Sequence, residues 1–158
     1  MNQKEIILDQ LKAMGFEPIE LGDVGFVFKY EDMNYLYMPD DDDEQFLRIV
    51  IPHLFEVTEE NRMAVLEAMH ETSLLLKYAK VNIMYESAAW AVYEHRLTTT
   101  DNLPELLEHI IRLLEAAAHV FYMKINGEEV AGRSDETSDE ELEAELQKIL
   151  DGIEEESN

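Results

Sequence analysis

Cysteine is absent from this sequence of 158 residues. Disulfide bonds, thiolate metal sites and cysteine nucleophiles are therefore excluded. Glycine is scarce as well, and the six glycines form neither a phosphate-binding loop nor a dinucleotide-binding fingerprint. Ser73 and Ser87 lack the G-x-S-x-G context in which a serine hydrolase holds its nucleophile. We therefore expect a protein that is not an enzyme, with no catalytic residue and no cofactor.

Basic residues are few, at 12 against 36 acidic residues, which gives a net charge of −24. Nucleic acids and anionic membranes are bound through cations placed against phosphates, so we expect neither as a partner. One alternative is an acidic protein that mimics nucleic acid and binds a basic protein in its place. A protein or peptide partner of basic or apolar character fits this composition better.

Long apolar runs are missing too. No run approaches the roughly 20 residues that a helix needs to cross a bilayer. The opening residues, MNQKEIILDQLKAMGF, lack the basic region and apolar core of a secretory signal peptide. We therefore expect a cytoplasmic protein.

Hydrophobic periodicity divides the first 125 residues into eight elements, enough for one domain with a core of its own. Ile7, Leu11 and Met14 fall at i, i+4 and i+7, which predicts a helix at the start of the chain. Runs rich in apolar and aromatic residues, bounded by turn residues, predict strands. The predicted order is helix 3–14, strands 26–30, 34–38 and 46–51, helix 58–78, strands 81–85 and 88–95, and helix 102–122.

Single residues predict where some of these elements begin and end. Pro52 cannot donate a hydrogen bond to a sheet, so we expect it to end the third strand. Thr58 is expected to cap the second helix. The helical period is then followed by Met63, Leu66, Met69 or His70, Ser73 or Leu74, and Lys77.

After residue 125 the character of the chain changes. Residues 126–158 contain 13 acidic and two basic residues, or −11 of the total charge. We predict a domain over residues 1–125, followed by an acidic linker and an amphipathic helix over residues 139–151. The apolar stripe of this helix consists of Leu142, Leu146, Ile149, Leu150 and Ile153. Such a short helix either frays in water or docks on its own domain or on a second copy.

The predicted strands are apolar on both sides. Phe46, Arg48 and Val50 alternate with three further apolar residues in the third strand, and Trp90 and Val92 alternate with small or aromatic residues in the fifth. A sheet with helices on one face is expected to be polar on the other. The second face is therefore predicted to meet the C-terminal segment, a second subunit or a segment of a client protein. The residues predicted to bind a protein are Phe46, Arg48, Val50, Trp90 and Val92.

A metal-binding alternative uses Glu67 and His70, which have the E-x-x-H spacing of di-iron helices. Such centres need two of these motifs and two further glutamates in a helical bundle, whereas this chain is rich in strands. Two other Glu–His pairs at i, i+4, which are Glu105/His109 and Glu115/His119, are expected to stabilise the last helix rather than bind metal. We therefore expect no metal site.

The run LLLKYAKVNIMYESAAWAVYEHRL, followed by LPELLEHIIRLLEAAAHVFY, resembles the YbjN-like family. The earlier segments GFVFKYEDMNYLYMP and QFLRIVIP are similar to the first three strands of that family. The resemblance covers about residues 4–125. It implies the fold of type III secretion chaperones, an α+β fold with a five-stranded antiparallel sheet and helices packed mainly on one face.

The resemblance also implies a small, acidic, dimeric binding protein. Secretion chaperones hold extended segments of their clients on apolar patches, and the YbjN-like branch has been linked to regulation. We therefore expect a non-enzymatic protein-binding module, chaperone-like or regulatory, that acts as a homodimer and binds a protein or peptide segment through apolar side chains on the sheet and on the middle helix. A metal-dependent enzyme and a nucleic-acid mimic are the alternatives.

Overall fold

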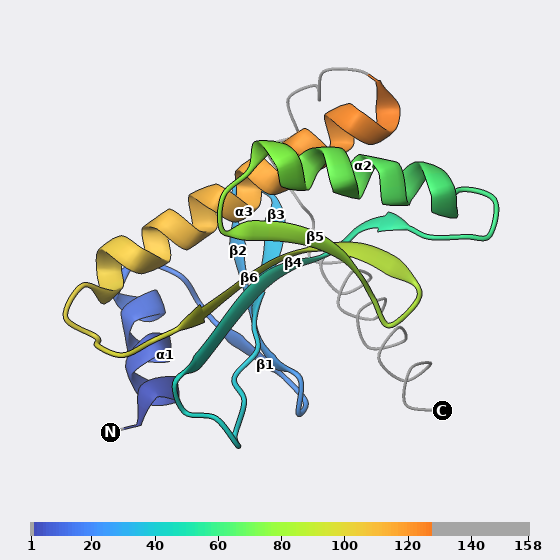
Figure 1. The fold of residues 1–158 in the computed structure, drawn as a ribbon. Helices are drawn as coiled ribbons and strands as arrows, with labels where there is room; N and C mark the ends of the chain where they lie inside the picture. The colour runs from blue at the N-terminus through green and yellow to red at the C-terminus, as the bar shows by residue number, and fades with distance from the viewer. Residues whose placement is uncertain (1, 128–158) are drawn as a thin grey trace.

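The computed structural model describes residues 2–127 of the chain as an α+β fold (Figure 1). The predicted helix over residues 139–151 lies outside the described residues. Within residues 2–127 there are three helices and six strands. In chain order they are α1 (Gln3–Ala13), β1 (Ile19–Leu21), β2 (Gly25–Tyr30), β3 (Met33–Tyr37), β4 (Phe46–Glu56), α2 (Arg62–Leu75), β5 (Ala79–Met84), β6 (Ala88–Arg96) and α3 (Leu103–Asn126).

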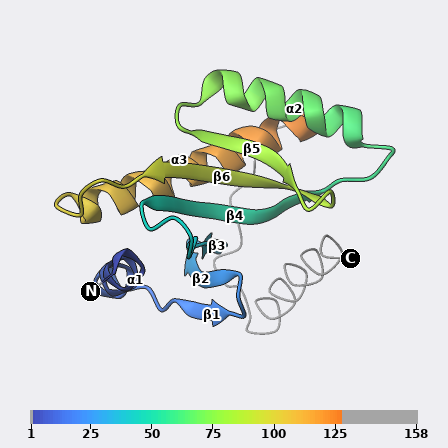
Figure 2. The same cartoon turned by 60° about the horizontal axis from the view of Figure 1, so that its bottom comes forward.

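The strands form one antiparallel sheet in the order β1-β2-β3-β4-β6-β5. Strand β4 is the long central strand, and it pairs with β3 on one side and with β6 on the other. Figure 2 shows α2 and α3 on the same side of β4, β6 and β5. The α+β class and the antiparallel sheet predicted from the sequence are therefore confirmed.

Alternating side chains divide the buried residues into two clusters, one on each face of the sheet. The larger cluster contains the buried residues of all three helices, together with strand residues such as Tyr35, Ile49 and Tyr93. We call the smaller one the sheet-face cluster, and its buried members come from strands and their turns alone. They are Leu21, Val27, Leu36, Met38, Val50, Ala88, Trp90 and Val92.

The predicted number of strands was wrong, because the described residues form six strands rather than five. The additional strand, β1, has only three residues and lies at the edge of the sheet, paired with β2. Three residues are too few to show a periodic pattern, so sequence reasoning did not detect this strand.

The predicted end of the third strand at Pro52 was also wrong, because β4 continues through this residue to Glu56. The pairing with β6 shifts register between Ile51 and Phe55, and His53 has a positive φ of 55°. Proline is tolerated at such an irregularity, because the ladder hydrogen bond that its nitrogen cannot donate is not required there. The bulge therefore allows a strand of 11 residues that contains a proline.

Helix α2 begins later than predicted, with Asn61 rather than Thr58 at its N-cap position. Thr58 and Asn61 instead bond each other in the turn before the helix. The Thr58 amide donates to Asn61 Oδ1 at 2.7 Å, and the Asn61 amide donates to Thr58 Oγ1 at 3.2 Å. The hydroxyl that was expected to cap the helix thus stabilises its preceding turn.

Stability is expected to fall at high pH because of Tyr37, which is 1% exposed in the larger cluster. Burial raises the pKa of its phenol far above the ordinary value of 10.0. Below pH 10 the Tyr37 phenol is protonated in both the folded and the unfolded protein. Above it only the unfolded state ionises, so the free energy of unfolding falls by up to about 1.4 kcal/mol per pH unit.

Urea unfolding between pH 8 and about pH 11.5 checks this expectation, and Tyr37→Phe should reduce the slope above the ordinary phenol pKa. Tyr93, whose pKa is also raised by burial, accounts for part of the slope that remains. An unchanged slope in the Tyr37→Phe protein would contradict the assignment.

Candidate functional site

The structure brings the five predicted binding residues onto the same face of the sheet. Val50 lies opposite Val92 in the pairing of β4 with β6. Trp90 is two residues before Val92 in β6, so its side chain points to the same face. These three side chains are buried in the sheet-face cluster. Phe46 and Arg48 are half-buried beside it, with the Arg48 guanidinium 4.9 Å from the Phe46 ring centroid. Whether the five residues bind a protein stays a prediction.

Trp90 is 1% exposed and is surrounded by aromatic rings. The ring of His53, in the β4 bulge, is centred 5.6 Å away, and that of Tyr85, in the β5–β6 turn, is centred 5.4 Å away. The indole Nε1 is buried and has no hydrogen-bond acceptor among residues 2–127. The same holds for Arg48 Nε at the edge of the cluster. Two donors on this face therefore lack a described acceptor.

Basic side chains are concentrated on the same face. The strand registers place Arg48 beside Val50, Lys80 opposite Val92, and Lys29 two residues after Val27. Arg96 also shares this face, so all four basic residues of the described strands lie there. Two strand carboxylates share this face: Glu94 pairs with Arg48 at 3.7 Å, and Glu56 lies opposite Ala88. Lys29 pairs with Asp32 of the β2–β3 turn, also at 3.7 Å. The strands thus give this face a positive charge in a strongly acidic chain.

The second apolar surface lies on α2, the middle helix whose apolar side chains were expected to bind together with the sheet; that they bind a protein stays a prediction. Met63, Leu66 and Leu74 were expected to track the helical period, but the buried face of α2 is formed by Val65, Ala68 and Thr72. Small inward residues allow α2 to pack closely against its neighbours, which leaves the large side chains outside. We call the exposed group the α2 stripe. Its members are Met63 (68% exposed), Leu66 (37%), Leu74 (72%), Leu75 (63%) and, just after the helix, Tyr78 (68%).

Charges around the α2 stripe are balanced, unlike those of the chain as a whole. Residues 62–78 contain Arg62 and Lys77 against Glu67 and Glu71. His70 is exposed on the same side, one helical turn before Leu74. The exposed apolar side chains of the α2 stripe thus lie on a segment without excess negative charge.

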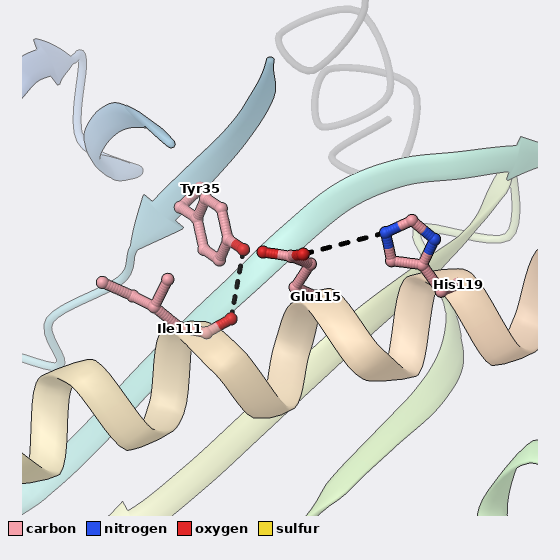
Figure 3. Close-up of polar contacts among 4 residues, drawn as sticks. All are labelled: Tyr35, Ile111, Glu115 and His119. Carbon is pink, nitrogen blue, oxygen red and sulfur yellow. Dashed lines mark hydrogen bonds and ion pairs between the residues drawn. The ribbon is translucent and has the colours of Figure 1, made fainter. Parts of the chain in front are cut away.

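The predicted Glu–His pairs show no metal centre. Glu67 and His70 are both exposed on α2, and residues 2–127 contain no group of three or more His, Cys, Asp or Glu side chains able to hold a metal ion. On α3, His119 Nε2 lies 3.8 Å from Glu115 Oε1 within the same helix (Figure 3).

One helical turn before Glu115, a buried hydrogen bond connects β3 to α3. The Tyr35 hydroxyl donates to the Ile111 carbonyl oxygen at 3.1 Å (Figure 3).

The acidic turn before β4 supplies its own hydrogen bonds. The Asp42 amide donates to Asp40 Oδ1 at 2.9 Å, and the Gln45 amide donates to Asp43 Oδ1 at 3.2 Å. These carboxylates are exposed and stabilise the turn. Their arrangement therefore has a structural explanation that requires neither a metal ion nor a partner.

None of the described helices is both long enough and apolar enough to cross a membrane. The chain matches no protein-family model and no curated protein sequence. The resemblance to the YbjN-like family therefore stays a prediction. The features of the described part that bear on function are its two apolar surfaces, the sheet-face cluster and the α2 stripe.

Proposed function

We propose that this chain is a non-enzymatic protein-binding module, chaperone-like or regulatory, that acts as a homodimer through the α2 stripe. The observation that carries the proposal is the exposure of Met63 and Leu74 on α2 and of Tyr78 just after it. Large apolar side chains exposed together in one segment are typical of protein–protein contacts. The resemblance to the YbjN-like family and to type III secretion chaperones supports the same function.

A second copy is the occupant that fits the α2 stripe best. Two chains of charge −24 repel each other, so they can associate only where the local charge is balanced, as it is around α2. In a two-fold contact each residue meets its counterpart reciprocally. An antiparallel pair of α2 helices that places Met63 against Leu74 of the other copy also places Glu67 against His70. The E-x-x-H pair would then serve dimerisation.

A protein or peptide segment is the proposed partner of the dimer. The sheet-face cluster and its edge, which include Phe46, Arg48 and Trp90, supply apolar and cationic side chains for it. Apolar side chains give affinity, whereas charges at the edge select among partners and set the rate of encounter. Chaperone-like retention and regulation both require only this reversible binding.

The homodimer is tested by light scattering at micromolar concentration. We expect the wild-type protein to have twice the mass of one chain, and Leu74→Glu to have the mass of one chain, because it buries a carboxylate in the contact. Ile19→Glu is the matched control, since Ile19 is 51% exposed on β1 and outside the α2 stripe. A wild-type monomer, or a Leu74→Glu dimer, would contradict the proposal.

A further inference from the structure

The sheet-face cluster is buried, yet the described helices contribute nothing to it. Leu36 and Val50 are 0% exposed, and Trp90 is 1% exposed. The buried apolar residues of α1, α2 and α3 all belong to the cluster on the opposite face. A single sheet buries a face only when another layer lies on it. The burial of these side chains therefore requires a layer that the described helices do not provide.

The chemistry of this face indicates what the layer contains. Its centre is apolar, and Lys29, Arg48, Lys80 and Arg96 share the face. Asp32 and Glu94 pair with Lys29 and Arg48, and Arg96 Nε donates to Gln45 Oε1, so four basic residues face two ion-pair carboxylates. Trp90 Nε1 and Arg48 Nε need acceptors that residues 2–127 do not supply. A segment that combines large apolar side chains with carboxylates fits the apolar centre of the face, its basic residues and its two donors without acceptors.

The C-terminal part of the chain has this combination. Residues 126–158 hold −11 of the total charge, and their predicted apolar stripe has five large side chains, four within the predicted helix and Ile153 just after it. The stripe from Leu142 to Ile153 would be about 18 Å long as a helix, whereas five neighbouring strands span about 20 Å. Residues 128–138 can span at most about 40 Å, enough to pass from the end of α3 around a domain of this size.

We propose that residues 139–153 dock on the sheet-face cluster of their own chain, with the stripe of Leu142, Leu146, Ile149, Leu150 and Ile153 against Trp90 and its neighbours. The docked segment covers the surface that a partner would use. A partner segment must then displace it, which makes the C-terminal segment an internal competitor; this consequence alone rests on the proposed function. A competing partner is expected to be apolar and acidic, as the segment itself is.

Trp90 reports on docking, because it is the only tryptophan of the chain. In the full-length protein we expect Leu146→Glu to move its emission to longer wavelength and to raise its acrylamide quenching constant roughly twofold or more, because uncovering the face exposes the indole. Ala144→Glu is the matched control. It adds the same charge on the opposite side of the predicted helix and should leave both readings unchanged.

A second pair of variants tests the charge complementarity. Lys80→Glu changes an exposed residue on the docking face, and we expect the same increase in quenching of Trp90. Lys12→Glu makes the same change at an exposed position of α1 and should have no effect. If Leu146→Glu abolishes cooperative unfolding of the whole protein, Lys80→Glu decides the question.

Unchanged Trp90 emission and quenching in both Leu146→Glu and Lys80→Glu would overturn the proposal. A Trp90 signal that depends on protein concentration, and not on these substitutions, would assign the covering layer to a second copy and would overturn it too. The dimer measured with Leu74→Glu is a separate observable, so failure of docking and failure of the proposed homodimer are distinguishable.

Discussion

Gly25→Ala is expected to lower the free energy of unfolding by about 3 kcal/mol or more, because the added methyl group meets backbone rather than side chain. A Cβ at Gly25 would lie against the carbonyl oxygen of Tyr37, well inside van der Waals contact. It would also be 3.0 Å from the Tyr37 carbonyl carbon and 3.2 Å from Met38 Cα. Backbone atoms of a paired strand cannot rotate away, so β2 and β3 would have to separate where β2 begins.

Gly22→Ala is the control for this prediction. Gly22 has a φ of +49°, but a Cβ there would meet nothing within 4 Å. Its substitution should therefore cost only the strain of a left-handed backbone, about 1 to 2 kcal/mol. Urea unfolding of the two variants separates the two effects. Equal losses in both would show that backbone conformation, and not the close approach of β2 to β3, determines the need for glycine at position 25.

Elements with strong local signals were predictable from the sequence. Ile7 and Leu11 of α1 are buried as their spacing indicates, and Asn2 caps that helix by accepting a hydrogen bond from the Glu5 amide at 2.9 Å. Pro104 lies in the first turn of α3, where it lacks only a hydrogen bond that the helix start does not form. These features depend on neighbours within one or two turns, so the sequence alone contains them.

Elements determined by tertiary contacts were not predictable in the same way. Strand β1 exists because it pairs with β2, and β4 passes Pro52 because a bulge shifts its register with β6. The inward face of α2 is set by packing in the larger cluster, which buries Val65 and Ala68 and leaves Met63 and Leu74 outside. Hydrophobicity alone predicts the opposite orientation, because it takes no account of how closely two layers approach.

One part of the candidate site was predictable from local sequence patterns, and another part depends on tertiary contacts. Alternation along two strands predicted that the sheet is apolar on both faces, and the burial of Val50, Trp90 and Val92 on the face away from the helices agrees with it. The gathering of Lys29, Lys80 and Arg96 on that same face depends on strand order and register. No local pattern contains this information, because the three residues come from three different strands.

Trp90→Ala is expected to lower the free energy of unfolding by about 3 to 5 kcal/mol, the usual cost of truncating a buried tryptophan. Trp90 is 1% exposed, packs beside His53 and Tyr85, and belongs to the sheet-face cluster with Val50 and Val92. Removing the indole leaves a cavity that alanine cannot fill, on the face where β4 and β6 pair. Chemical unfolding followed by circular dichroism measures the loss without relying on tryptophan fluorescence.

Trp90→Phe is the matched variant, and it should cost less than half as much, about 1 to 2 kcal/mol, because an aromatic ring still fills most of the space. The two variants distinguish a packed side chain from a binding anchor. A packed Trp90 gives a stability loss that grows with the volume removed and is the same at every protein concentration. A side chain that served only a partner would leave the unfolding curve of the isolated protein unchanged in both variants, and this result would contradict the burial on which the role of the sheet-face cluster depends.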